Sequence, residues 1–569
     1  MPNHKLTIYQ LLPRLFGNKN TTNKFYGSVE ENGVGKLNDI THKALAEIKA
    51  MGFTHVWYTG VIEHATMTDH SAHGIKVDDP DVVKGRAGSP YAIKDYYDIA
   101  TDLAVDPEFR ISEFKELVGR THRAKMKVII DFVPNHVART YASDVKPDGV
   151  RDFGEDDDST MNFSPDNDFY YIPGQPFIVP GGYNPGGDEF TSPLKDGKFD
   201  EFPAKATGND VFNPAPTIND WFETIKLNYG VYYLDGKKSY FDHIPPLWHK
   251  MFHILTYWAQ MGVDGFRCDM IEMVPVEFWA WLIPKIKAAY PDMIFIGEAY
   301  DKNQYYNYIH NGGFDYLYDK VGLYDAIRRL TCNEPGASTW EINAVWNNHC
   351  RGIDEHMLRF MENHDEQRVA SRFFAGDAAL AIPGMIVSAT LATGPVMIYS
   401  GQEVGEPAEG EMGFSGDDGR TTIFDYWGVP AHQQWMNNGV FDGANLSSAQ
   451  KELRNFYGKL LNLVKDNEAL SQGGFYELMI ANEYQPGFDT MLYIYLRYTG
   501  NQKVLVIANF NRAERAINIK IPVELLAQFN LSGPAVFTDM LTGATFNTVD
   551  IDAGMPVVIG ASNALMLTL

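Results

Sequence analysis

The sequence predicts a (β/α)₈ barrel with an inserted subdomain after its third strand and a C-terminal antiparallel β-sandwich. Three observations support this fold class. Short apolar runs alternate with helical patterns over most of the chain, a long gap separates two of these runs, and period-two strands begin after about residue 475. At 569 residues the chain is too long for one compact core, so we expect several domains.

The alternating runs are typical of βαβ units around a parallel sheet. The expected strands are Thr7–Leu12, Thr54–Thr59, Lys127–Phe132, Val263–Cys268, Ile294–Gly297, Phe314–Tyr318, Met357–Phe360 and Val396–Tyr399. The expected helices include Asp39–Met51, Ile111–Ala124, Leu247–Met261 and Val276–Ala289, which pair apolar positions at spacings of three and four. Eight strands with helical crossovers fit a closed barrel, and a doubly wound open sheet is the alternative.

Spacing along the chain locates the insertion. Asp269 and Glu298 are 29 positions apart, close to the roughly 30 residues of one βα unit. Asp131 and Asp269 are 138 positions apart, so roughly a hundred residues must leave the barrel between its third and fourth strands. We therefore expect residues 1–136 and 244–474 to form the barrel, 137–243 a loop-rich inserted domain, and 475–569 the β-sandwich.

Composition narrows the range of partners. The formal charge is −25, from 73 acidic against 48 basic residues, which disfavours nucleic acid and anionic membrane but is neutral toward a polysaccharide. The three cysteines, Cys268, Cys332 and Cys350, predict neither a disulfide framework nor a cysteine-ligated metal. The N-terminal segment lacks the apolar core of a signal peptide, so we expect a cytoplasmic protein, or a secreted or periplasmic one whose leader was removed.

Polar residues follow several of the expected strands, where barrel enzymes place their chemistry. The third strand delivers Asp131, Asn135 and His136, the fourth Arg267 and Asp269, the fifth Glu298, and the seventh Asn363, His364 and Asp365. A single aspartate after a strand is usually a turn or helix cap, but four strand ends with acids beside histidine and arginine indicate a site. Clustered carboxylates are typical of glycoside hydrolysis, in which one attacks or activates water and another protonates the leaving oxygen.

The segments DFVPNH, GFRCD, GEA and ENHD resemble, in order, the four conserved segments of the α-amylase family, glycoside hydrolase family 13. The resemblance covers essentially the whole chain. Within the family, the chain resembles bacterial α-amylases and neopullulanase-type enzymes. The resemblance implies a retaining glycoside hydrolase that cleaves α-1,4-glucosidic bonds in starch-like glucans or malto-oligosaccharides. No cofactor is implied for the chemistry.

The resemblance also implies a role for each matching residue. Asp269 would be the nucleophile, Glu298 the general acid/base, and Asp365 the carboxylate that stabilises the transition state. Further expected site residues are His136 and His364 as sugar-binding groups, Arg267 orienting Asp269, Asp131 in support, and Tyr91 stacking on the sugar, with Tyr96 and Tyr97 close by in sequence. Asn135 matches a position that binds structural calcium in many relatives, and the alternative is a hydrogen bond within its loop.

The surroundings of Glu298 and Asp365 in the sequence indicate which of the two donates the proton. Glu298 ends an apolar run with no adjacent cation, whereas Asp365 follows His364 in a polar segment near Arg368. Less solvation and fewer cations raise a carboxyl pKa, so we expect Glu298 to be the proton donor.

Alternatives to hydrolysis remain open at this stage. A transglycosylase would use the same mechanism, and a catalytically silent glucan-binding protein would use the same scaffold. Trp221, Tyr229, Tyr232 and Tyr233 fit either a sugar cleft or packing of the insertion. Endo or exo action, chain-length preference and oligomeric state are not predicted.

Overall fold

The computed structural model describes residues 5–411 and 416–568. Eight parallel strands form a closed barrel in the order β1-β16-β15-β14-β13-β12-β5-β2. Their bounds are β1 (Thr7–Leu11), β2 (His55–Tyr58), β5 (Lys127–Phe132), β12 (Gly265–Cys268), β13 (Ile294–Gly297), β14 (Tyr316–Tyr318), β15 (Met357–Phe360) and β16 (Val396–Tyr399). The predicted barrel is confirmed, because β1 pairs with both β2 and β16 and leaves no open edge.

The register of the barrel places the expected site residues at one rim. In the pairing of β5 with β12, Arg267 lies opposite Asp131. In the pairing of β12 with β13, Cys268 lies opposite Gly297, so Asp269 and Glu298 leave their strands at the same level. Because parallel strands present their carboxyl ends at one face, residues far apart in sequence meet there.

The helices surround the barrel, and most of them bury one face, whereas α10 (Ile382–Thr390) is buried almost all round. The predicted helices appear as α3 (His42–Ala50), α4 (Arg110–Arg123), α5 (Pro246–Gln260) and α6 (Val276–Ala289). The later ones include α7 (Tyr305–His310), α8 (Asp325–Thr331), α9 (Trp340–Ala344), α10 (Ile382–Thr390), α11 (Pro430–Met436) and α12 (Ser448–Asp466). In α4 the buried side chains Phe114, Leu117 and Val118 recur at helical spacing. A capping box of Ser447 and Gln450 begins α12.

A loop-rich segment lies between β5 and α5. Its short strands are β6 (His136–Ala138), β7 (Tyr171–Ile172), β8 (Ala204–Lys205), β9 (Thr224–Lys226), β10 (Val231–Tyr232) and β11 (Lys238–Ser239). They pair only as antiparallel couples, β6 with β9, β7 with β8 and β10 with β11. Buried ion pairs supplement this small amount of sheet, since Arg139 Nη1 donates to Glu201 Oε1 at 2.6 Å.

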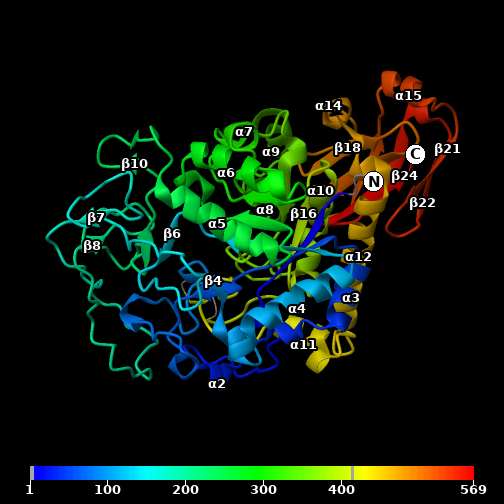
Figure 1. The fold of residues 1–569 in the computed structure, drawn as a ribbon. Helices are drawn as coiled ribbons and strands as arrows, with labels where there is room; N and C mark the ends of the chain where they lie inside the picture. Colours follow the sequence, from blue (N-terminus) through cyan, green and yellow to red (C-terminus); the bar gives the residue numbers. More distant parts are fainter. Residues whose placement is uncertain (1–4, 412–415, 569) are drawn as a thin grey trace.

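The C-terminal region forms an antiparallel sandwich of a six-stranded and a two-stranded sheet. The larger sheet has the order β17-β18-β19-β24-β21-β22 and the smaller pairs β20 with β23. Their bounds are β17 (Gly474–Glu477), β18 (Leu492–Tyr498), β19 (Lys503–Asn509), β20 (Arg515–Ile519), β21 (Ala535–Asp539), β22 (Thr545–Thr548), β23 (Met555–Ile559) and β24 (Asn563–Thr568). Figure 1 shows this sandwich and the inserted segment at opposite ends of the molecule.

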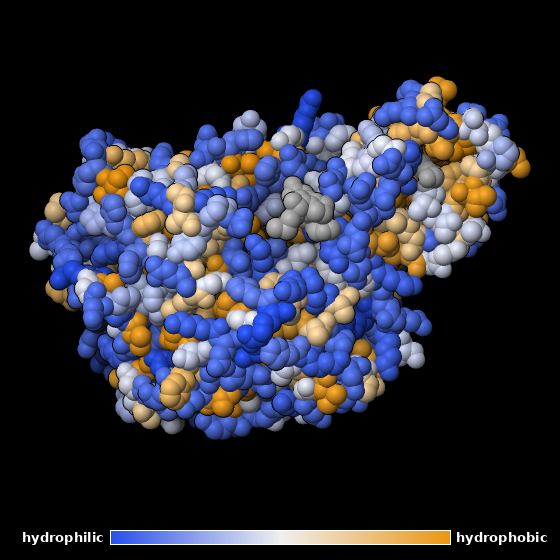
Figure 2. Space-filling view, turned by 45° about the vertical axis from the view of Figure 1, so that its right-hand side comes forward, coloured by the Kyte–Doolittle hydropathy of each residue, from blue (hydrophilic) through white to orange (hydrophobic). Residues whose placement is uncertain are grey.

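The face of the molecule in Figure 2 is mainly hydrophilic, with hydrophobic residues in small separate patches. This distribution agrees with the strongly acidic composition. Among the residues described, no helix has the length and apolar character needed to cross a membrane.

Candidate active site

Asp269, Glu298 and Asp365 line one cavity of about 470 Å³ at the carboxyl rim of the barrel. Asp269 follows β12, Glu298 follows β13, and Asp365 lies beyond the end of β15. Asp269 and Glu298 are buried, whereas Asp365 is partly exposed to the cavity. A larger hollow of about 1160 Å³ lies beside α12 and the sandwich, but the three expected catalytic carboxylates and His136 line the smaller one.

Arg267 is the cation at the centre of this group. Its Nη1 donates to Asp269 Oδ1 at 2.8 Å, and its Nη2 lies 2.8 Å from Glu298 Oε1. The guanidinium is fully buried, and its Nε donates to the hydroxyl of Tyr318 at 3.1 Å. Its planar fork therefore spans two carboxylates at fixed positions, which a lysine cannot do.

Glu298 has further partners that fix its carboxyl group. The hydroxyl of Tyr300 donates to Glu298 Oε1 at 2.8 Å, and the backbone N–H of Met270 donates to Oε2 at 3.0 Å. Met270 has a φ of 42°, in the left-handed region that a methionine rarely adopts. Strained backbone of this kind is typical of functional sites.

One argument from the sequence is wrong here. Glu298 has no cation beside it along the chain, yet Arg267 reaches it from the neighbouring strand. Asp365, in contrast, contacts the ring of His364 at 3.2 Å, while the nearby Arg368 is paired with Glu362 at 2.9 Å instead. Glu298, and not Asp365, is therefore the carboxyl group with an arginine beside it, which is the opposite of the expectation.

The electrostatics of the cavity favour retention of a proton. Burial raises the pKa of Asp269 and of Glu298, and the Arg267 guanidinium opposes the rise in both. The pKa of Asp365 is raised well above its usual range by burial and by the charge of Glu298. Burial likewise raises the pKa of Asp131 to about 6. Four acids around one guanidinium cannot all ionise readily, so the protonation of each carboxyl group depends on that of the others.

Tyr91 lines the cavity and contacts Asp131 of β5 and His364 beyond the end of β15. Its hydroxyl donates to Asp131 Oδ1 at 3.3 Å and contacts His364 Nε2, and its ring stacks on His364 with centroids 5.2 Å apart. Tyr96 and Tyr97 point elsewhere, since the hydroxyl of Tyr96 donates to a backbone carbonyl and that of Tyr97 contacts His253. Among these three tyrosines, the geometry places Tyr91 in the cavity.

The two histidines are neutral hydrogen-bonding groups. Burial lowers the pKa of His136 to about 3 and that of His364 well below its usual range. Gln10 Nε2 lies 2.8 Å from His364 Nδ1 and holds that ring in place. A neutral imidazole offers one donor and one acceptor, which suits sugar hydroxyls.

Several cavity residues were not predicted. Tyr300, Met270 and Lys84 line the cavity without having been identified in the sequence. Tyr300 lies two positions after Glu298, so period-two alternation was a usable signal for it. Trp221 also lines the cavity, with its ring 5.3 Å from that of His136. Of the other aromatics proposed with it, Tyr232 packs against Phe163 within the insertion, whereas Tyr229 packs against Phe278 of α6. The hydroxyl of Tyr233 donates to the carbonyl of Met273.

Asn135 does not fit a calcium ion. Its Oδ1 accepts a hydrogen bond from Lys226 Nζ at 2.7 Å, and its Nδ2 donates to the carbonyl of Gly208 at 2.8 Å. The same ammonium group lies 2.6 Å from Asp210 Oδ1 and is almost fully buried. The ammonium group of Lys226 therefore already occupies the position between Asn135 Oδ1 and Asp210 Oδ1.

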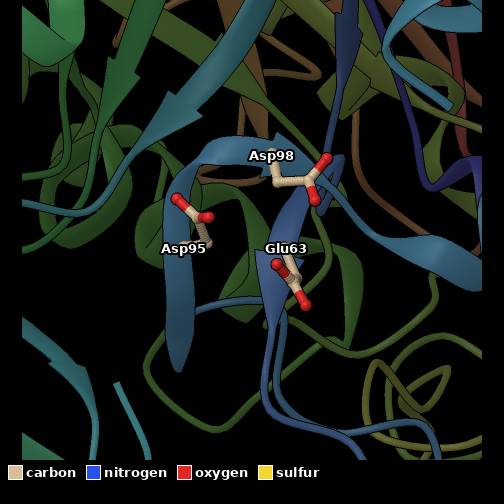
Figure 3. A group of neighbouring side chains, drawn as sticks. All are labelled: Glu63, Asp95 and Asp98. Carbon is tan, nitrogen blue, oxygen red and sulfur yellow. The ribbon is translucent and has the colours of Figure 1, made fainter. Parts of the chain in front are cut away.

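Three buried carboxylates with the ligand chemistry of a hard cation lie outside the cavity. Figure 3 shows Glu63 on β3 (Ile62–His64) beside Asp95 and Asp98 on β4 (Ile93–Ile99). One oxygen of each lies within 4.8 Å of the others. Arg110 is paired with Asp98, Lys94 Nζ lies 3.9 Å from Glu63 Oε1, and both oxygens of Asp95 accept backbone N–H groups. Protein cations and amides thus already neutralise much of this cluster, although burial still raises the pKa of Glu63 to about 9.

Comparisons with known proteins identify the family of the chain. The family model of the α-amylase catalytic domain matches residues 10–473. The chain belongs to the α-amylase family. It is accordingly a glycoside hydrolase of α-amylase type.

Three individual proteins illustrate how similar the chain is to known relatives. The chain is 23% identical over 506 residues to α-amylase 3 of Dictyoglomus thermophilum, covering 85% of this chain and 82% of that protein. It is 40% identical over 76 residues to an α-1,4-glucan:maltose-1-phosphate maltosyltransferase of Rhodospirillum rubrum, covering 13% of this chain and 11% of that one. The fold resembles a maltogenic α-amylase of Thermotoga neapolitana with a TM-score of 0.60 and 19% identity, covering 99% and 98% of the two chains.

Proposed function

We propose that this enzyme cleaves α-1,4-glucosidic bonds in starch-like glucans or malto-oligosaccharides with retention of configuration. The observation that carries the proposal is the guanidinium of Arg267 between Asp269 and Glu298, which fixes two carboxyl groups on one wall of a cavity. A double displacement needs such a pair, with one group ionised and the other able to carry a proton.

Each residue has a role in the proposed reaction. Asp269 attacks the anomeric carbon while Glu298 gives its proton to the departing glycosidic oxygen, so a covalent glycosyl-enzyme forms. Glu298 then removes a proton from water, which attacks the same carbon and releases Asp269. Asp365, His136 and His364 bind the hydroxyl groups of the reacting sugar, Tyr91 stacks on its ring, and Asp131 supports Arg267.

The assignment of the proton donor is tested with leaving-group chemistry. Glu298→Gln should be severely impaired on ordinary glucans and much less so on glycosyl fluorides, which need little protonation. Asp365→Asn should be impaired on both substrates, because it acts on the sugar rather than on the leaving group. The reverse pattern would exchange the two roles.

Product analysis separates hydrolysis from its alternatives. Maltoheptaose incubated with the enzyme should give only shorter sugars over time. Longer products would identify a transglycosylase, and unchanged substrate with measurable binding would identify a silent glucan-binding protein. Water and a second sugar compete for the same intermediate, so the time course decides between them.

We also propose that Lys226 takes the structural place of calcium between Asn135 and the insertion. Its ammonium group joins Asn135 at the end of β5 to Asp210 of the inserted segment. A bound divalent cation would meet this buried charge at close range, and the repulsion in a low-dielectric setting is severe. The proposal predicts that stability does not depend on added calcium.

A further inference from the structure

Two further hollows adjoin the catalytic cavity on the side of Lys84 and Phe424. Lys84, Ile218 and Phe424 line both the cavity and a second hollow of about 500 Å³. Phe25, Tyr26 and Asn184 line both that hollow and a third of about 690 Å³. Because each hollow shares lining residues with the next, the three lie side by side, and we call the second and third hollows together the outer groove.

The walls of the outer groove have the chemistry of a sugar-binding surface. Phe25 is 49% exposed, and its ring lies against that of Tyr26 with centroids 4.1 Å apart. The remaining lining residues are largely polar, including Asn184, Ser28 and Thr191. Aromatic faces bind the apolar faces of pyranose rings, and polar side chains bind the hydroxyl groups at their edges.

The aromatic pair is held at this place by both sides of the groove. The backbone of Tyr26 has a φ of 53°, in the left-handed region, and its ring packs so closely on Gly187 that a Cβ there would lie 2.8 Å from Tyr26 Cδ2. Lys24 Nζ lies 2.6 Å from both Glu31 Oε1 and Glu189 Oε2. The loop that carries Phe25 and Tyr26 is thus tied to the inserted segment across the groove.

We propose that the outer groove binds glucosyl units of the substrate beyond those at the cleaved bond, with Phe25 and Tyr26 as the stacking platform. This inference rests on the proposed α-glucan substrate. With this platform the enzyme prefers longer malto-oligosaccharides. Only these reach Phe25 and Tyr26 while their reacting bond lies between Asp269 and Glu298. The energy of these remote contacts is available to the reaction of long chains alone.

The test compares a long and a short substrate. Phe25→Ala should lower kcat/KM on maltoheptaose about tenfold, the upper end expected for loss of one aromatic contact. It should change kcat/KM on 4-nitrophenyl α-maltoside less than twofold, because that substrate is too short to reach the groove. Phe25→Trp should keep most of the activity on maltoheptaose, since it preserves the aromatic face.

Tyr484→Ala is the matched control, since it removes an 88% exposed aromatic side chain that follows α14 (Met479–Asn482) in the C-terminal region. It should leave both substrates unchanged. If Phe25→Ala lowers kcat/KM equally on the two substrates, or on neither, the proposed binding role of the outer groove is wrong, while the proposed function stands. A wild-type enzyme that turns over neither substrate would overturn the proposed function itself.

Discussion

Replacing Arg267 by methionine should raise the pH at which the enzyme begins to work. The guanidinium lies 2.8 Å from oxygens of both Asp269 and Glu298. At an effective dielectric constant of about 20, each contact corresponds to roughly 6 kcal/mol of attraction, most of which is offset by the desolvation of buried ions. A net contribution of about 1.5–3 kcal/mol is typical of a hydrogen bond to a charged group.

That energy stabilises the ionised form of Asp269, so its loss raises the pKa of this carboxyl by about 1–2 units. Attack requires an ionised Asp269, and activity is lost as the pH falls through its pKa. The acidic limb of kcat/KM against pH should therefore move upward by about 1–2 units, with roughly 10- to 100-fold lower activity at the optimum. Arg267→Lys, which keeps the charge but loses the fork, should shift the limb less.

Arg359→Met supplies the control for this experiment. Arg359, on β15, is also buried and paired. Its Nε donates to Asp319 Oδ2 at 3.1 Å, and Asp319 directly follows the neighbouring strand β14. Its loss should lower the melting temperature without moving the acidic limb. An Arg267→Met profile that superimposes on the wild-type profile would refute the electrostatic role assigned to Arg267.

Further predictions concern the nucleophile, the stereochemistry and the metal. Asp269→Asn should lower turnover by about 10⁴-fold or more with an unchanged circular dichroism spectrum, and a variant with a tenth of wild-type activity contradicts the assignment. NMR of the first product should show the α-anomer, and a β-anomer indicates inversion. In a retaining enzyme the carboxyl groups of Asp269 and Glu298 are expected to lie roughly 5–5.5 Å apart. A chelator should leave the melting temperature unchanged, whereas Lys226→Met should lower it by several degrees, because Asp210 is left without its cation. A rise in the melting temperature on addition of calcium would contradict the proposal that Lys226 takes the place of the ion.

The sequence was sufficient to predict the barrel and the residues at its rim. Apolar runs such as Lys127–Phe132 and Ile294–Gly297 have strand length and are bounded by polar residues, and the structure has strands with these same bounds. Once a parallel barrel is predicted, the rule that its strand ends converge brings Asp131, Asp269 and Glu298 to one rim. The domain boundaries and the individual catalytic roles remain predictions.

Only the tertiary structure decided which charges and walls meet at the site. Arg267 contacts Glu298 across a strand pairing, and Lys226 reaches Asn135 from 91 positions away. The outer groove forms between the loop of Phe25 and the inserted segment, which are separated by more than 150 residues. Hydrophobic periodicity is a local property that repeats within each element and so can be read from sequence. Ion pairs and cavity walls depend on which loops fold against one another, and no local pattern in the chain encodes that choice.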